Sequence, residues 1–317
     1  MNKFFTFYFI LLTLLSNAQT KSFYKNGKIE SEGIYINKLK SGIWEYYHDN
    51  GNLAGIGSYI NGELDGQWQF YNKYGKLFST CYYKNGKQEG EWKQFGTDGK
   101  SVVILNFKNG LLDGLYKSYS YNELTIGQCK NGLKDGIWKV FENDRQLDAN
   151  LIEQTNYISG NIDGERKLYS YVQDHGKIME LEYYKLGEKI GTWKSYFLEN
   201  KQLMSIGGYL NGQKDGEFIK YFYNGKIYSK EFYKSGKKFG IEANYWETGS
   251  LESIRNYKEG LIDGEEQIFS LSGKPVFIIN WKNGKQHGES KVYDGFGDLL
   301  SIAVYDMGKF ISSKRFK

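Results

Sequence analysis

The sequence predicts an all-β protein: an elongated, single-layer antiparallel meander of about a dozen tandem β-hairpin repeats. Glycines recur at a fixed interval, because Gly62, Gly86 and Gly110 are each 24 residues apart. Aromatic residues make up 17% of the chain and glycine occurs 39 times, a mixture that favours strands joined by glycine turns. Beyond the N-terminus, no stretch keeps the 3.6-residue apolar spacing of an amphipathic helix.

Two kinds of turn alternate along each repeat. The first is an Asn-Gly dipeptide, whose residues adopt the positive φ of tight hairpins. It occurs at Asn61-Gly62, Asn85-Gly86, Asn109-Gly110, Asn131-Gly132, Asn211-Gly212 and Asn283-Gly284. The second turn falls half a repeat later, at Gly51, Gly75, Gly99, Gly176, Gly225, Gly249, Gly273 and Gly297. Consecutive strands are therefore expected to run antiparallel.

Aromatic residues mark the strands between these turns. One strand of each repeat carries a Gly-x-Trp-x-x-Tyr element, as at Trp44 and Tyr47. Because repeats stack in register, the rings are expected to form ladders. Small residues leave room for a neighbouring ring to lie over bare backbone. They are Gly55, Gly57, Gly207 and Gly208. Trp44 and Tyr47 differ in strand parity, so both faces are candidates for carrying rings.

Residues 1–18 are expected to be a signal peptide. Basic Lys3, an apolar run from Phe4 to Leu15 and a small-residue site ending at Ala18 are the three parts of such a leader. An uncleaved anchor is the alternative, although the run is shorter than the ~20 residues that span a bilayer. We expect residues 19–317 to be an exported repeat domain, periplasmic, at the cell surface or secreted, with no transmembrane segment after cleavage.

Two cysteines, Cys81 and Cys129, lie two repeats apart. At ~4.8 Å per strand their backbones are expected to be about 19 Å apart. A disulfide needs Cα atoms within about 7 Å of each other. The sequence therefore predicts that these cysteines do not form a disulfide.

The charge of the chain is mixed. The formal net charge is +5, from 42 basic and 37 acidic residues, which indicates a solvated surface rather than a polyanion-binding one. Bidentate contacts to bases and phosphates need arginine, and the chain has only Arg145, Arg166, Arg255 and Arg315. We expect no nucleic-acid partner.

The pattern Tyr-x-Asn-Gly-x-x-Asp-Gly-x-Trp-x-x-Tyr-x-x-x-Gly-x-Leu, complete from Tyr59 to Leu77, resembles the MORN-repeat variant of many bacterial proteins. The resemblance covers about residues 23–310 in eleven copies. It implies a twisted, open run of β-hairpins used as a scaffold, with no enzymatic residue. Some relatives are antitoxin-like. Better-known MORN units have a second glycine where this chain has Trp or Tyr, which weakens any transfer of phosphoinositide binding.

Residues suited to catalysis or metal binding are few. His48, His175 and His287 fall in or beside turns of different repeats, and we interpret them as solvated turn residues rather than ligands or general bases. One repeat position holds Asp65, Asp113, Asp135, Asp163, Asp215 and Asp263. A calcium-binding row is one interpretation of these aspartates, and capping of tight Asp-Gly turns is the other. We expect no enzyme, no cofactor and no metal site.

Irregular repeat spacing marks two further segments, 143–156 and 172–180. Insertions in repeat proteins usually become loops on one face, often the binding face. The two segments are therefore candidate partner contacts, and tolerated surface insertions are the alternative.

The expected function is that of a non-catalytic scaffold that binds another protein along its sheet. The alternatives are binding of glycan or cell-wall polymer through exposed aromatic ladders, association with a membrane surface, and an antitoxin- or immunity-like role. Solvent exposure separates the first two, because a buried ring offers no platform for a sugar. The deciding residues are Trp44, Trp68, Trp92, Trp138 and Trp193.

Overall fold

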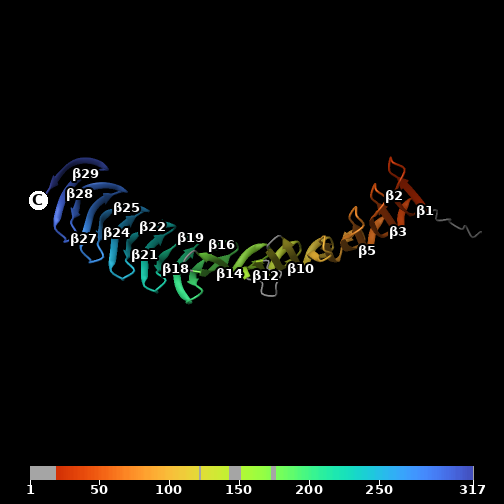
Figure 1. Cartoon of the computed structure of the whole chain (residues 1–317), viewed down its shortest axis with the longest axis horizontal. Helices are drawn as coiled ribbons and strands as arrows, with labels where there is room; N and C mark the ends of the chain where they lie inside the picture. The colour runs from red at the N-terminus through yellow and green to blue at the C-terminus, as the bar shows by residue number, and fades with distance from the viewer. Residues whose placement is uncertain (1–18, 121–122, 143–150, 173–175, 317) are drawn as a thin grey trace, which may run out of the picture. The chain divides into compact units, whose positions relative to one another are not determined.

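The computed structural model describes residues 19–120, 123–142, 151–172 and 176–316. They form two compact units, one made mainly of residues up to 120 and the other mainly of residues from 134 onward. In these ranges every regular element is a β-strand, and strands that pair with one another run antiparallel (Figure 1). The predicted all-β antiparallel meander of hairpins is confirmed. The leader expected at residues 1–18 lies outside the described residues.

The N-terminal unit is a row of hairpins in chain order. Its strands are β1 (Gln19–Phe23), β2 (Ile29–Ile36), β3 (Leu39–Tyr47), β4 (Leu53–Ile60), β5 (Glu63–Tyr71), β6 (Leu77–Lys84), β7 (Lys87–Gln88), β8 (Gly90–Phe95), β9 (Ser101–Lys108) and β10 (Leu111–Ser120). The next strand, β11 (Glu123–Lys130), contributes residues to both units.

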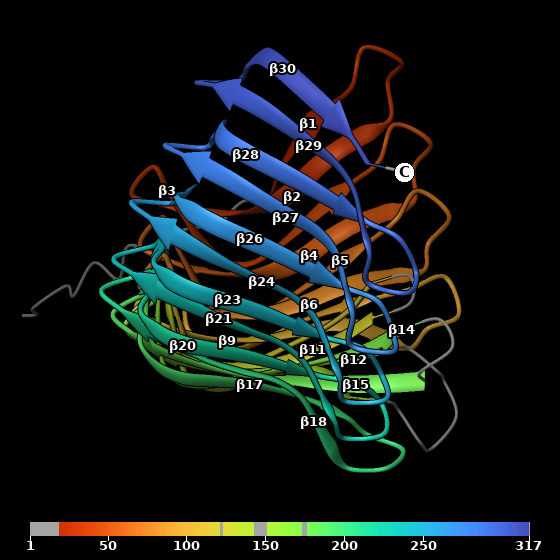
Figure 2. The same cartoon turned by 90° about the vertical axis from the view of Figure 1, so that its left-hand side faces the viewer.

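The C-terminal unit continues the same order, and Figure 2 shows its strands lying side by side from β17 to β30. They are β12 (Leu133–Glu142), β13 (Leu151–Ile158), β14 (Asn161–Val172), β15 (Gly176–Lys185), β16 (Glu188–Lys189), β17 (Gly191–Phe197), β18 (Gln202–Leu210), β19 (Gln213–Lys214), β20 (Gly216–Tyr221), β21 (Ile227–Lys234), β22 (Lys237–Lys238), β23 (Gly240–Tyr245), β24 (Leu251–Lys258), β25 (Leu261–Ile262), β26 (Gly264–Phe269), β27 (Pro275–Lys282), β28 (Lys285–Tyr293), β29 (Leu299–Asp306) and β30 (Lys309–Arg315).

The predicted Asn-Gly turns are confirmed. Asn61 and Gly62 have φ values of 51° and 84°, the double positive φ of a type I′ hairpin turn. Other residues take the asparagine position with the same positive φ in repeats that lack it. They are Ser159, Leu186, Ser235, Glu259 and Met307. The backbone N–H of Gly62 also donates to the carbonyl of Lys40 in the preceding repeat (2.9 Å), so the turn helps to hold the two repeats together.

The Asp-Gly dipeptides do not form turns, which corrects the interpretation of their aspartates as turn caps. Asp65 and Gly66 lie inside β5, where the pairing with β4 jumps from Ser58–Asp65 to Ile56–Gln69. Gly66 has a φ of 84° at this β-bulge. Within this bulge β5 has two more residues than β4, and Gly57 of β4 lies against the ring of Trp68.

Rings lie over bare glycine backbone, as predicted. A Cβ atom on Gly57 would clash with the indole of Trp68, and one on Gly207 would clash with the ring of Phe218. At Gly55 the added atom would lie 3.2 Å from the ring of Phe70. Gly208 differs, because its neighbour is the backbone oxygen of Asp215 and not a ring.

Burial distinguishes the two faces of the sheet. Neighbouring residues on a strand point to opposite faces. Trp44 is 2% exposed, whereas adjacent Ile43 is 64% exposed, and Trp138 and Ile137 show the same contrast at 4% and 54%. We call the face that holds Trp44, Trp68 and Trp138 the tryptophan face, and the face that holds Ile43 and Ile137 the isoleucine face. The tryptophan face is the core of this single-layer sheet.

The two irregular segments are mostly strand where they are described, so the expectation of loops was wrong there. Residues 151–156 belong to β13, which pairs with β12 and β14. Residues 176–180 belong to β15, which pairs with β14 without a register shift from Gly164–Tyr184 to Val172–Gly176. A longer hairpin takes up the additional residues. Residues 143–150 and 173–175 lie outside the described residues.

Substitution of Gly57 tests the contact between ring and glycine. Gly57→Ala forces the Trp68 ring or the backbone to move and is expected to destabilise the protein by about 1–3 kcal/mol, as overpacked cores do. Gly295→Ala is the control, because a Cβ there has open space and Gly295 lacks a positive φ. Urea unfolding of both variants is the measurement. Equal stability of the two variants would contradict the packing described above.

Candidate functional site

Lysines cover the rings of the tryptophan face. Lys40 Nζ lies 4.3 Å from the Trp44 ring centroid and 5.2 Å from that of Tyr59. Lys189 stacks in the same way on Trp193 and Tyr209, at 4.3 Å and 5.3 Å. A cation over aromatic faces is attracted to them. These lysines therefore cover ring surface that would otherwise face water.

In three repeats of the C-terminal unit, a charged residue replaces the ring at the tryptophan position. Arg166, Glu242 and Glu266 each stand two residues after the second glycine of their repeat, where Trp44 stands in the first. Glu242 and Glu266 are 5% and 6% exposed. Buried carboxylates need partners.

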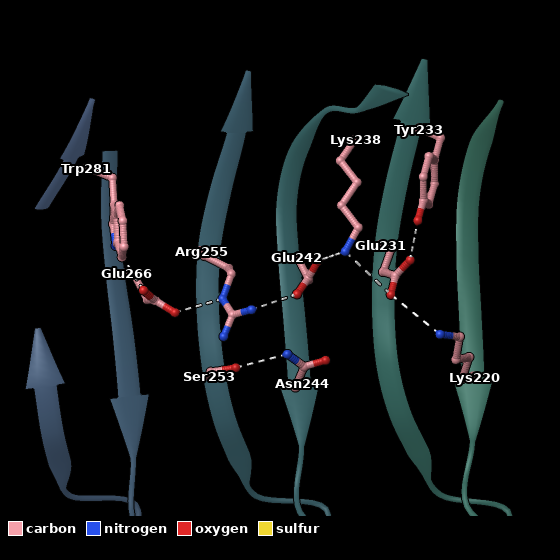
Figure 3. Close-up of polar contacts among 10 residues, drawn as sticks. All are labelled: Lys220, Glu231, Tyr233, Lys238, Glu242, Asn244, Ser253, Arg255, Glu266 and Trp281. Carbon is pink, nitrogen blue, oxygen red and sulfur yellow. Dashed lines mark hydrogen bonds and ion pairs between the residues drawn. The ribbon is translucent and has the colours of Figure 1, made fainter. Parts of the chain in front are cut away.

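These partners form a continuous chain of polar contacts from β20 to β27, which we call the charge ladder (Figure 3). Glu231 lies 3.7 Å from both Lys220 and Lys238. Lys238 also pairs with Glu242. Its equivalent in the first repeat, Lys40, stacks on the Trp44 ring. A lysine at this position can therefore contact either an aromatic ring or a carboxylate.

Arg255 completes the charge ladder. Its guanidinium lies 3.2 Å from Glu242 and 2.9 Å from Glu266, so one arginine neutralises two buried carboxylates. Glu266 in turn accepts a hydrogen bond from the indole N–H of Trp281 (2.9 Å). Arg166 repeats the arrangement nearer the start of the unit, between Glu153 (3.2 Å) and Glu182 (3.4 Å).

Glu231 has a perturbed pKa. Burial alone would raise the pKa of this carboxyl, but the hydrogen bond from the Tyr233 hydroxyl (2.7 Å) and the charges of Lys238 and Lys220 outweigh it. The pKa of Glu231 is therefore lowered from its ordinary value of 4.5. The ionised carboxylate stabilises the folded state.

The aspartates before the second glycines join one repeat to the next. A carboxylate oxygen of Asp65 accepts the backbone N–H of Asn85 in the following turn (3.3 Å), and Asp263 accepts that of Asn283 (3.0 Å). Asp113, Asp135, Asp163 and Asp215 make the same contact. Sequence reasoning missed this role. A signal for it was that each aspartate precedes the next turn by 18 to 24 residues, about one repeat.

The structure places His48 beside the turn that follows β3 and His287 within strand β28, in different repeats. His48 contacts the carbonyl of Tyr71 (2.9 Å), and His287 lies 3.2 Å from Asp306. His175 lies outside the described residues. Within the described ranges, no group of three or more His, Cys, Asp or Glu side chains is placed to hold a metal ion, and no catalytic site is evident.

The exposure of tryptophan bears on the glycan alternative. Trp44, Trp68 and Trp138 are 4% exposed or less, so their rings are closed to a sugar. Trp92 and Trp193 are part-exposed. Cys81 and Cys129, on β6 and β11, are also buried, and the described part of the chain contains no disulfide between them.

The isoleucine face is the more open surface. Large apolar side chains on it are exposed in both units, including Ile43 and Tyr82 in the first and Phe232 and Ile241 in the second. Phe232 and Ile241 are 41% and 53% exposed. No helix in the described ranges is long and apolar enough to cross a membrane.

These features define a tandem-repeat protein in which each β-hairpin is covered by its neighbours. Five of its segments match the family described as MORN repeat variant, namely residues 17–37, 40–61, 64–85, 88–109 and 214–235. The chain therefore carries repeats of the MORN repeat variant family, as the sequence pattern predicted.

Comparison with curated proteins and with solved structures identifies no further family. A search of curated proteins finds no match. The crystal structures of TcdB2-TccC3-TEV and TcdB2-TccC3 align with 91% and 90% of the chain, at 11% and 10% identity and TM-scores of 0.20 and 0.17. The chain spans only 17% and 20% of those two chains. Such a likeness carries no argument about function.

Arg255 tests the charge ladder. Arg255→Met leaves Glu242 and Glu266 buried without a guanidinium and is expected to cost about 3–5 kcal/mol in urea unfolding. The combination of Glu242→Leu, Arg255→Met and Glu266→Leu removes the carboxylates as well and should recover most of that loss. If the triple variant were less stable than Arg255→Met, the buried charges would not be the cause.

The pH dependence of stability tests Glu231. Because the folded pKa is lowered, its contribution is present above the unfolded pKa and is lost as pH falls through the folded pKa. The free energy of unfolding should fall between about pH 5 and pH 3, and Glu231→Gln should flatten that slope. An unchanged slope in the variant would show that other carboxylates dominate acid unfolding.

Proposed function

We propose that the chain is an exported, non-catalytic scaffold that binds another protein along the isoleucine face of its sheet. One observation carries the proposal. The tryptophan face is closed by its own rings, lysines and ion pairs, whereas the opposite face keeps apolar side chains in solvent. Exposed apolar surface on a soluble protein is typical of an interaction site.

Repetition supports a binding role for this surface. Each hairpin presents its own set of side chains at nearly the same spacing, so a partner that follows the sheet gains contact area with every repeat. Export is the part of the proposal that rests on the leader-like residues 1–18.

Paired substitutions test which surface binds. A tagged full-length chain is used to recover partners from an envelope fraction of the source cells, beside a Phe232→Ser, Ile241→Ser variant. The control variant is Leu271→Ser, Phe296→Ser, which removes side chains that are 61% and 79% exposed but lie at the second turns. The face variant is expected to lose a partner that the wild type and control retain, by about tenfold or more.

Two outcomes would contradict the proposal. Equal recovery by the face variant and the wild type would exclude the isoleucine face as the contact. Loss of the partner by the turn variant alone would move the binding surface to the edge of the sheet. Circular dichroism of both variants establishes that the sheet is intact.

A further inference from the structure

Asn-Gly dipeptides occur at both kinds of turn. Six lie at the first turns, and their asparagines are Asn61, Asn85, Asn109, Asn131, Asn211 and Asn283. Three lie at the second turns, with Asn26, Asn50 and Asn224. All nine asparagines are exposed to solvent. Asn-Gly is the dipeptide in which asparagine deamidates most readily, because glycine has no side chain to hinder attack by its backbone nitrogen.

The asparagine side chains of the second turns are held at both ends. Asn26 Oδ1 accepts the backbone N–H of Lys28 (3.0 Å), and Asn26 Nδ2 donates to the carbonyl of Asp49 in the following second turn (3.0 Å). Asn50 and Asn224 make the equivalent pair of contacts. A side-chain amide held in this way must lose both hydrogen bonds before it can approach the nitrogen of the next glycine.

The asparagine side chains of the first turns make no hydrogen bond to any residue that the structure describes. Contacts of the backbone hold these turns. The N–H of Asn85, for example, donates to the carboxylate of Asp65 (3.3 Å). The Asn85 amide group is therefore not restrained by a partner of its own.

The glycine nitrogen does not distinguish the two kinds of turn. The N–H of Gly86, at a first turn, donates to the carbonyl of Leu64, and that of Gly27, at a second turn, donates to the carbonyl of Tyr24, both at 2.9 Å. The difference between the turns therefore lies in the asparagine side chain.

We propose that the six first-turn asparagines are sites of spontaneous deamidation, whereas side-chain hydrogen bonds protect the three at the second turns. The glycine backbone nitrogen loses its proton to water and bonds to Cγ of the asparagine, and the amide nitrogen leaves as ammonia. Water then opens the resulting succinimide ring at either carbonyl and gives aspartate or isoaspartate. Each event consumes one water and releases one ammonia.

The consequence of the reaction differs among the six sites. At four of them a carboxylate already accepts the backbone N–H of the asparagine, in the pairs Asp65 with Asn85, Glu89 with Asn109, Asp113 with Asn131, and Asp263 with Asn283. A second carboxylate on that residue repels the first and weakens the contact between repeats. Asn61 and Asn211 have no such neighbour, because the repeat position holds Ser41 and Ile190.

Ageing of the full-length protein at mildly alkaline pH tests the proposal. Peptide mapping by mass spectrometry follows the gain of aspartate and isoaspartate at each asparagine. The first-turn sites are expected to react at least about tenfold faster than the second-turn sites, because two hydrogen bonds must break before a second-turn side chain can react. The same chain unfolded in urea is the control, and there both classes should react at similar rates.

Equal rates at the two kinds of turn in the folded protein would overturn the proposal. Unreacted first turns in the folded protein, beside a reacting unfolded chain, would overturn it as well, because the fold would then protect both classes.

Aspartate variants test the consequence for stability. Asn85→Asp and Asn109→Asp place a carboxylate beside Asp65 and Glu89, and Asn61→Asp is the matched control at an equivalent turn. The unfolding equilibrium constant of the first two variants is expected to be about two- to fivefold larger than that of the control near neutral pH. Urea unfolding is the measurement. Equal stability of all three variants would contradict repulsion between the carboxylates.

Discussion

Lateral contact between successive hairpins is the constraint on which this structure depends. The sheet has a single layer, so no second layer covers its apolar side chains. Each ring must be covered by the hairpin before it and the hairpin after it, as Trp68 is by Gly57 and its aromatic neighbours Tyr59 and Phe70. Turn-to-turn hydrogen bonds, such as Gly62 N–H to Lys40 O, hold those neighbours in place. The repeat is stable only as part of a row.

Within this constraint, the chain uses two different chemistries on the same backbone. In the N-terminal unit, a bare glycine and an indole fill the space between strands, as at Gly33 and Trp44. In the later repeats of the C-terminal unit, Arg255 and Glu266 fill the equivalent space with an ion pair, whereas Phe218 still lies over Gly207 in an earlier one. The lysine position adapts to both, since Lys40 stacks on Trp44 and Lys238 pairs with Glu242. The tryptophan face is satisfied internally in either case, and recognition falls to the opposite face.

Local chemistry explains which features could be predicted from the sequence. Type I′ turns follow from Asn-Gly, and the ring over Gly57 follows from the size of glycine beside Trp68. The role of Asp65 could not be predicted in this way, because its partner is the backbone of Asn85 in another repeat. Glu242 and Glu266 look like interruptions of an aromatic pattern until Arg255 is seen between them. The segment 172–180 was expected to loop out, but its described residues pair between β14 and β15 and lengthen the hairpin.

The charge ladder also affects how the chain tolerates gain or loss of whole hairpins. Where rings and glycines alternate, removal of one repeat leaves another ring beside another glycine. Removal of the repeat that contains Glu242 and Arg255 would instead place the part-buried carboxylate of Glu231 next to the buried carboxylate of Glu266, without a cation between them. Basic and acidic side chains thus alternate along the charge ladder, and each depends on the neighbouring strands for its partners. In that stretch electrostatics opposes the loss of a single repeat, whereas aromatic repeats carry no such penalty.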